Sequence, residues 1–328
     1  MTAPPAEYRA TEQENIILGR FRAAHQDLFQ KNDARLFLHL GIVICLLTFG
    51  TVLAISVPWA PVKILIASVN ALFWFSLINA TIHHHQTHRN AAKNIFAKKF
   101  LDFLYLIVVP NAPKRLNRYT RAHLNHHARP FHETDVDHHY GKDRYLAMMG
   151  SPWRKLLYFL ELTFVGAHVP GWQDDHYMNL VPLENWGRRD YQKVKAEERR
   201  PALKTAVIRW GGFLIALSAG ELLKFNPLGQ FLQAAAWGWA YPMLLVKNWA
   251  HFLGQFQHYD EKFLDSSRSI LQRAKTYRLP RALNYLAGGE ISGHFLHHIY
   301  PELPYYNVEA ARQRFIEDPE LSRLFASY

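Results

Sequence analysis

Apolar residues gather in four long runs along the chain, and polar stretches separate the runs. They cover residues 37–59, 64–82, 206–222 and 231–250. Each is close to the roughly 20 apolar residues that a helix needs to cross a bilayer. Short polar turns join the first run to the second and the third to the fourth, so the pattern predicts four transmembrane helices in two hairpins. Buried helices of a soluble protein fit less well, because these runs have almost no polar face.

The polar stretches that follow each hairpin are long enough to form a helical cap, over residues 83–205 and 251–328. Within the first of them, two short apolar stretches at residues 96–109 and 153–165 are interrupted by charged side chains. That pattern is typical of amphipathic helices at a membrane interface. We therefore expect an all-α integral membrane protein in which residues 1–328 form a single domain.

Positive charge lies mainly on one side of the predicted hairpins. The chain carries 38 Lys and Arg residues against 27 Asp and Glu residues, a net charge of +11. Basic residues precede the first run and follow the second, whereas the two hairpin turns carry only Lys63 and Lys224. By the positive-inside rule, both termini and the cap are expected on the cytoplasmic side. Residues 1–35 are polar and charged, and they predict a cytosolic tail or surface helix rather than a secretory signal.

Histidine is the unusual residue of this composition, with 19 copies that mostly lie in three boxes. The first box covers residues 83–88, directly after the second apolar run. There His88 pairs with His84 at a spacing of i, i+4, or with His83 one residue earlier. The second box consists of His123, His126 and His127, and the third of His294, His297 and His298. Such spacing places the imidazoles of each box on one face of a helix.

Three boxes on the same side of the predicted spans indicate a metal site. Eight imidazoles are too many for one tetrahedral ion, and they suit two metal ions with open positions for oxygen or substrate. A zinc protease would need Glu directly after the first histidine of a box, and His85 and Gln86 occupy those positions. The single cysteine, Cys45, lies in an apolar run and leaves no thiolate set for an iron–sulfur cluster.

The ordered boxes resemble those of the membrane fatty acid desaturase and hydroxylase superfamily, in which one HxxxH box precedes two HxxHH boxes. Residues 284–307, with Gly288-Gly289-Glu290 before the third box and Pro301-Glu-Leu-Pro304 after it, are also similar to that family. The resemblance implies two iron ions held almost entirely by imidazoles. It also implies a ninth histidine after the fourth span, where His258 fits better than His251. Some acyl-CoA desaturases use an HxxxxH first box, so the choice between His83 and His84 stays open.

Carboxylates near the boxes are candidates for orienting the metal ligands, because a metal-bound imidazole usually donates its other N–H group. Glu290 lies one turn before the third box, and Asp135 and Asp137 follow the second. The alternative is that these carboxylates are solvated loop charges. The remaining histidines are not expected to bind metal. His132, His138 and His139 are expected to support the metal ligands or to lie in loops. Structural roles are expected for His25, His39, His168 and His176.

The resemblance implies an oxygen-dependent oxidoreductase that inserts a double bond into a long acyl chain. Hydroxylation, or oxidative decarboxylation of a free fatty acid to a terminal alkene, would begin with the same hydrogen abstraction. A non-catalytic metal-binding membrane protein or transporter fits less well, because transporters place polar groups at mid-membrane. Electrons would come from a separate donor of the ferredoxin, rubredoxin or cytochrome b5 type with its reductase. Residues 114–121 offer a basic surface for that donor or for anionic lipid, and the long apolar runs argue against nucleic acid.

Overall fold

The computed structural model is helical throughout the part of the chain that it describes, with no strand among those residues. This confirms the all-α class for that part. The predicted ligands His251 and His258, and the carboxylates Asp135 and Asp137, lie outside the described residues. The described residues are 12–108, 120, 123–124, 126–127, 150–154, 156–157, 160, 211–246, 277 and 279–325.

The first two apolar runs form an antiparallel hairpin of helices α3 (Asp33–Ser56) and α4 (Ala60–Ile78). Among the described helices, two are long and apolar enough to cross a membrane: α3, and α4 with its continuation to residue 87. The side chain of Asn32 caps α3 by accepting a hydrogen bond from the backbone N–H of Arg35. Both helices begin four residues earlier than predicted. Their first turns contain charged residues and a proline, which an apolar pattern does not include.

The turn between α3 and α4 is shorter than predicted and covers residues 57–59. Pro61 lies in the first turn of α4, where the missing N–H group costs no hydrogen bond. Lys63 therefore lies in the helix and not in the turn. Its ammonium group is buried 3.4 Å from the carboxylate of Glu221, which ties the first hairpin to the second.

The second hairpin is described in part. Residues Gly211–Leu222 form a helix, and α12 (Pro227–Ala235) continues through the π-helix η5 (Ala236–Ala240) to residue 246. The π-helix packs beside α3 and α4, where the indole N–H of Trp74 donates to the carbonyl of Gly238 at 2.7 Å. These helices overlap the third and fourth apolar runs, although α12 begins four residues before the fourth run, and the four-span layout remains a prediction.

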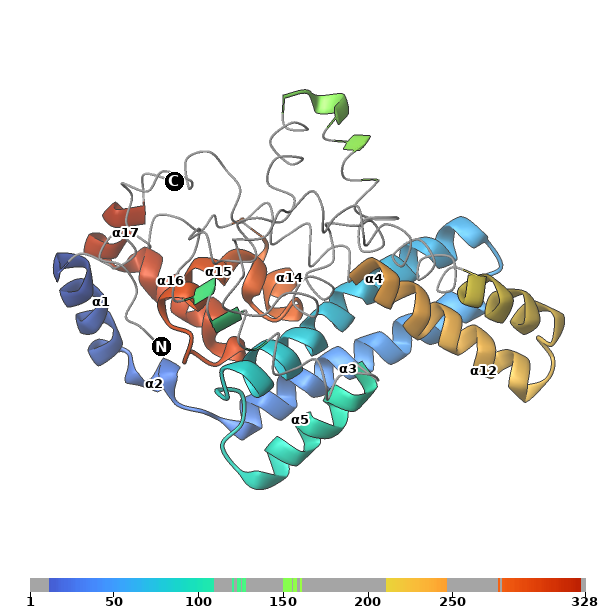
Figure 1. The fold of residues 1–328 in the computed structure, drawn as a ribbon, viewed down its shortest axis with the longest axis horizontal. Helices are drawn as coiled ribbons and strands as arrows, with labels where there is room; N and C mark the ends of the chain where they lie inside the picture. Colours follow the sequence, from blue (N-terminus) through green and yellow to red (C-terminus); the bar gives the residue numbers. More distant parts are fainter. Residues whose placement is uncertain are drawn as a thin grey trace, which may run out of the picture.

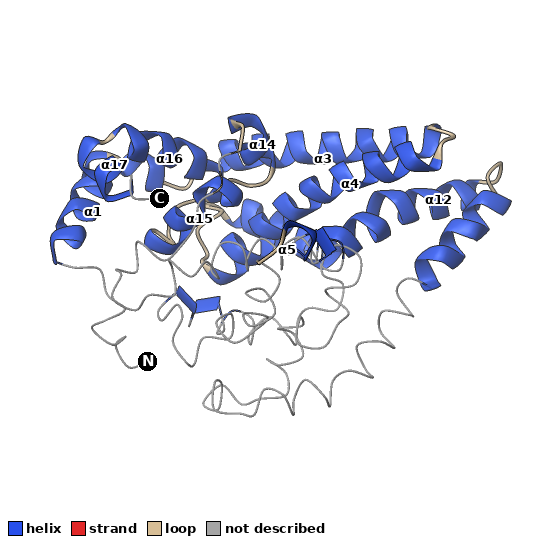
Figure 2. Cartoon of the chain, turned by 90° about the horizontal axis from the view of Figure 1, so that it is seen from above, coloured by secondary structure: helices blue, strands red, loops and turns tan. Residues whose placement is uncertain are grey.

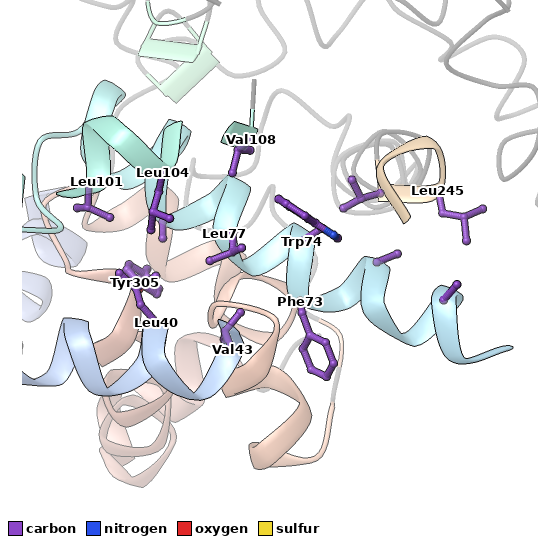
Figure 3. Close-up of a cluster of buried hydrophobic side chains, with 14 of the residues drawn as sticks. Leu40, Val43, Phe73, Trp74, Leu77, Leu101, Leu104, Val108, Leu245 and Tyr305 are labelled. Atoms are coloured by element: carbon purple, nitrogen blue, oxygen red, sulfur yellow. The ribbon is translucent and has the colours of Figure 1, made fainter. Parts of the chain in front are cut away.

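A hydrophobic core fills the space between the spans and helix α5 (Ile95–Val108). Figure 3 shows Leu40 of α3, Leu77 of α4 and Leu101 of α5 converging with Tyr305 from the C-terminal region. The outer face of α5 is not purely polar, since Phe96, Phe103, Leu106 and Ile107 are exposed beside its charged residues. An exposed apolar face of this kind suits the lipid interface predicted for residues 96–109.

The C-terminal helices form a cap at one end of the α3–α4 hairpin (Figures 1 and 2). Helix α1 (Glu12–Ala24) packs on the cap through Phe21, which lies among Leu296, Tyr300 and Phe315, and Arg20 pairs with Glu320 at 2.7 Å. The N-terminal helices are therefore part of the cap rather than a free tail. The elements of the cap are α1 (Glu12–Ala24), α2 (Gln26–Phe29), α14 (Arg281–Leu286), α15 (Glu290–Ile299), η8 (Tyr305–Asn307), α16 (Val308–Glu317) and α17 (Pro319–Phe325).

Candidate metal centre

The first histidine box lies on a π-helix, η2 (Asn79–Thr87), which continues α4 toward the cap. The sequence predicted an ordinary helix with ligands at i, i+4. In a π-helix the turn closes at i+5, as seen where the backbone N–H of His88 bonds to the carbonyl of His83 at 2.9 Å. Residues four and five apart therefore flank the same face. As a result His83 and His84 both lie on the side of the helix that carries His88.

The other polar residues of this box face away from the cap. The Nε2 atom of His85 lies 2.9 Å from Oδ1 of Asp102 on α5, and the amide of Gln86 donates to the same oxygen at 2.7 Å. The box therefore has two faces, one against α5 and one toward the other histidines.

Four imidazoles from all three boxes meet through their Nε2 atoms. His123 lies 3.2 Å from His88 and 3.3 Å from His297, and His127 lies 3.0 Å from both His123 and His297. With metal–nitrogen bonds of about 2.1 Å, ligand nitrogens lie about 3.0 Å apart at right angles and about 3.4 Å apart at tetrahedral angles. The observed spacing fits ligands of one metal ion, and we call these four residues the first cluster.

The protonation of the first cluster also suits a metal. Burial, with the repulsion of neighbouring rings, lowers the pKa of His88 to about 3 and the pKa of His123, His127 and His297 well below the usual value. The rings are therefore neutral at pH 7. A neutral imidazole has a single N–H group, and His123, His127 and His297 all contact one another, so the four short contacts cannot all be hydrogen bonds. A cation at their centre would accept all four lone pairs.

A second cluster lies directly beside the first. The Nε2 atoms of His294 and His298 are 3.0 Å apart. The ring centroids of His126 and His298 are 4.9 Å apart. The rings of His127 and His298 are 4.5 Å apart, so the two clusters are adjacent. Burial and the neighbouring rings of His294 and His126 also lower the pKa of His298 well below the usual value.

Glu290 lies behind both clusters. Its carboxylate is 2.8 Å from Nε2 of His84, 3.4 Å from Nδ1 of His297 and 3.6 Å from Nδ1 of His294. His297 belongs to the first cluster and His294 to the second, and both turn the opposite ring nitrogen toward this carboxylate. Burial alone would raise the pKa of Glu290, but hydrogen bonds with His294 and His84 outweigh it and hold the pKa well below the usual value. The carboxylate is therefore ionised.

The family model for fatty acid desaturases matches residues 56–325. The chain belongs to the fatty acid desaturase family. This confirms the resemblance inferred from the three boxes. Membership implies an oxygen-dependent oxidoreductase that acts on fatty acyl substrates in a lipid environment, and the histidine clusters are compatible with its metal site. No individually curated protein matches the chain.

In this fatty acid desaturase family member, Asn90 is a site residue that the sequence did not reveal. Its amide donates to the carbonyls of Pro301 and Leu303 at 2.7 and 3.0 Å, so its Oδ1 atom must accept from Nδ1 of His84 at 3.1 Å. The proton of a neutral His84 is thereby fixed on Nδ1. Nε2 lies 2.8 Å from Glu290, and its hydrogen bond to the carboxylate requires a second proton on the ring.

The structure brings together every predicted box ligand that it describes. These are His83, His84, His88, His123, His126, His127, His294, His297 and His298, with Glu290 behind them. His83 stacks on His123, with the ring centroids 5.1 Å apart, so it also lies at the centre. Two histidines expected to be structural have other partners: His25 lies 3.2 Å from the guanidinium of Arg314, and His39 is buried between α3 and the cap.

Proposed function

We propose that this chain is a multi-pass membrane di-iron enzyme that uses O2 to insert a double bond into a long acyl chain. The observation that carries the proposal is the convergence of imidazoles from three separate boxes into two adjacent clusters, in a chain that belongs to the fatty acid desaturase family. When bound, iron would supply the oxidant for an unactivated C–H bond, which acid–base groups cannot break.

The proposed ligands are divided between the two clusters. The first iron would be held by the four Nε2 atoms of the first cluster. The second would be held by the second cluster with His84, whose Nε2 atom lies beside Glu290, and with His258, which lies outside the described residues. Glu290 would hold His294 and His297 in place through their Nδ1 atoms, and Asn90 would hold His84 through its Nδ1 atom. The complete proposed set is His84, His88, His123, His126, His127, His258, His294, His297 and His298, with His83 and His251 as alternatives.

The proposed topology follows from the position of the clusters relative to the spans. They lie where α4 ends and α3 begins, at the end of the hairpin that carries Arg35, Arg89 and Lys93. The opposite end carries the Lys63–Glu221 ion pair. This asymmetry supports a centre at the cytoplasmic surface with both termini on that side. The acyl chain would lie among the spans, and a separate electron donor would dock on the cap.

The reaction is tested by expressing the chain with a reductase system and profiling lipids, free acids and headspace hydrocarbons by mass spectrometry. Desaturation predicts a new double bond at unchanged chain length. Added oxygen would instead identify a hydroxylase, and a product one carbon shorter would identify a decarboxylase. No product with stoichiometric zinc in place of iron would contradict the oxygenase proposal altogether.

The site is tested by replacing His127 or His297 with Ala, which should abolish turnover and lower the iron content. The matched control is His85→Ala, because His85 belongs to the first box but turns toward Asp102. This control should keep iron and activity. Full activity in His127→Ala or His297→Ala would refute the assignment.

A further inference from the structure

A hydrogen-bonded tyrosine–histidine pair lies beside the clusters and has no role in the proposed ligand set. The side chain of His39 is fully buried in α3. Its Nε2 atom lies 2.9 Å from the carbonyl oxygen of Tyr285, and its Nδ1 atom lies 3.0 Å from the hydroxyl of Tyr305. A carbonyl oxygen can only accept, so Nε2 carries the proton of the neutral ring. Nδ1 is then a free base, and the Tyr305 hydroxyl donates to it.

Tyr305 also touches the proposed metal site. Its ring centroid lies 5.5 Å from that of His84, and its side chain is 1% exposed. Figure 3 shows Tyr305 packed among core side chains, close to Leu40. The phenol thus has three properties at once: a metal-ligand candidate on one side, a proton acceptor on the other, and no access to water.

We propose that Tyr305 and His39 form a proton-coupled redox pair that removes one oxidising equivalent from the metal centre when no acyl chain is bound. The inference rests on the proposed function, since the oxidant is the oxidised iron centre. With oxidised iron bound there, Tyr305 would give up one electron to it, its O–H bond would break, and the proton would form an N–H bond at Nδ1 of His39. The products are a neutral tyrosyl radical and an imidazolium whose Nε2–H still donates to Tyr285.

The pair returns to its starting state by the reverse step. One electron from the donor that serves the main reaction reduces the radical, and the proton moves back from His39 to the phenolate oxygen. The pair would protect the histidine ligands, which are the oxidisable groups nearest to the metal, from oxidation. The alternative is a purely structural hydrogen bond that ties the cap to α3, and the experiment below separates the two.

The adjacent Tyr306 provides a matched control. Its ring lies 5.3 Å from that of Tyr305, and it is also buried. Its hydroxyl, however, accepts from the backbone N–H of Asn32 at 2.8 Å and donates to the carbonyl of Ala91 at 3.2 Å. A backbone carbonyl is a far weaker base than an imidazole, so Tyr306 has no group to take its proton on oxidation.

The test mixes the reduced, iron-loaded protein with O2 in the absence of acyl substrate and freezes it for electron paramagnetic resonance. We expect a tyrosyl signal that ring-deuterated tyrosine narrows and that bound acyl substrate suppresses. The signal should be lost in Tyr305→Phe and retained in Tyr306→Phe. It should also be lost in His39→Leu and in His39→Gln, because glutamine can keep the hydrogen bond but cannot take the proton.

The outcomes distinguish this inference from the proposed function. A wild-type protein with two irons and normal product but no tyrosyl signal would overturn the redox pair and leave the function standing. A signal that persists in Tyr305→Phe, or that is unchanged in His39→Gln, would also overturn it. Absence of iron and product would overturn both. Iron content, measured for every variant, identifies any that fails to fold.

Discussion

Single side chains decide the protonation of this site more than its overall composition does. Asn90 and His39 show the same principle. An oxygen that can only accept fixes the proton of a neutral imidazole on the nearer ring nitrogen, so the other nitrogen keeps its lone pair. Carbonyl oxygens ultimately fix both arrangements, because a carbonyl can only accept. The chemistry of the centre therefore depends on backbone groups that surround it.

Asn90→Leu should weaken metal binding. The change removes the acceptor for Nδ1 of His84 and frees the ring to rotate, and loss of such an outer partner typically costs about 10–100-fold in metal affinity. Iron titration of the purified protein measures the effect. The control is Asn226→Ala, which removes the cap of α12 at about 1 kcal/mol without touching a histidine. Equal iron affinity in the Asn90 variant and wild type would contradict the role.

Glu309 should contribute stability that depends on pH. Burial would raise its pKa, but hydrogen bonds from Arg312, Gln313 and Asn284 lower it below the value of 4.5 that an unfolded chain would have. The contribution is therefore fully present above pH 4.5 and is lost as the pH falls through the folded pKa. Thermal unfolding should show Glu309→Gln less stable than wild type at pH 7, with the gap closing in acid. A gap that is constant with pH would contradict this account.

At the scale of elements, the turn before α15 decides where the third box lies. Gly288 and Gly289 both have positive φ values, of 78° and 79°, which side chains with a Cβ atom rarely adopt. A Cβ atom at Gly289 would lie 2.9 Å from the carbonyl oxygen of Tyr305 and from the side chain of Val308. The sharp turn therefore allows α15 to begin at Glu290 in close contact with η8 and α16.

Gly289→Ala should destabilise the cap by about 1–3 kcal/mol, the usual cost of a residue held in a strained backbone region. The shift of α15 should also lower iron occupancy, because Glu290 and the third box move with it. Chemical unfolding and iron content measure the two effects. Gly19→Ala in α1 is the control, since a Cβ atom there meets nothing within 4 Å and alanine favours the helix. Wild-type stability in Gly289→Ala would argue against the strain.

At the scale of the whole molecule, the clusters join elements that are far apart in sequence. The first cluster draws on His88 at the end of η2, on His123 and His127 and on α15, and Glu290 links both clusters from behind. A metal ion bound there would cross-link the end of α4 to the cap. The metal would then contribute to folding as well as to chemistry, because a ligand that binds only the folded state stabilises it.

Removal of iron with a chelator should therefore lower the melting temperature of the protein. For a metal at a thousandfold excess over its Kd the stabilisation is about 4 kcal/mol. His127→Ala should start from the lower melting temperature and respond little to the chelator, whereas His85→Ala should behave like wild type. Calorimetry in detergent with measured iron content provides the comparison. A melting temperature that does not depend on iron would contradict the cross-link.

The sequence alone determined the helical class, the apolar runs, the three boxes and the family, because these depend on periodicity and residue type over short distances. Apolar runs specify membrane-length helices through the thickness of the bilayer, and the i, i+3, i+4 spacing of His123 or His294 specifies a shared helix face. Even Glu290 could be selected by its distance of one turn from His294.

Only the tertiary structure decided which nitrogen of each ring faces the centre, because that depends on partners distant in the chain. Asn90 bonds to Pro301 and Leu303, which lie more than 200 residues away, and so holds its oxygen toward His84; nothing in its spacing marks this role. The π-helix at the first box likewise replaces the predicted α-helix in a segment that packs against both α5 and η8. Local pattern selects residues and helices. Which group donates and which accepts between distant elements decides the tautomer of each histidine ring, and no pattern within one helix contains that information.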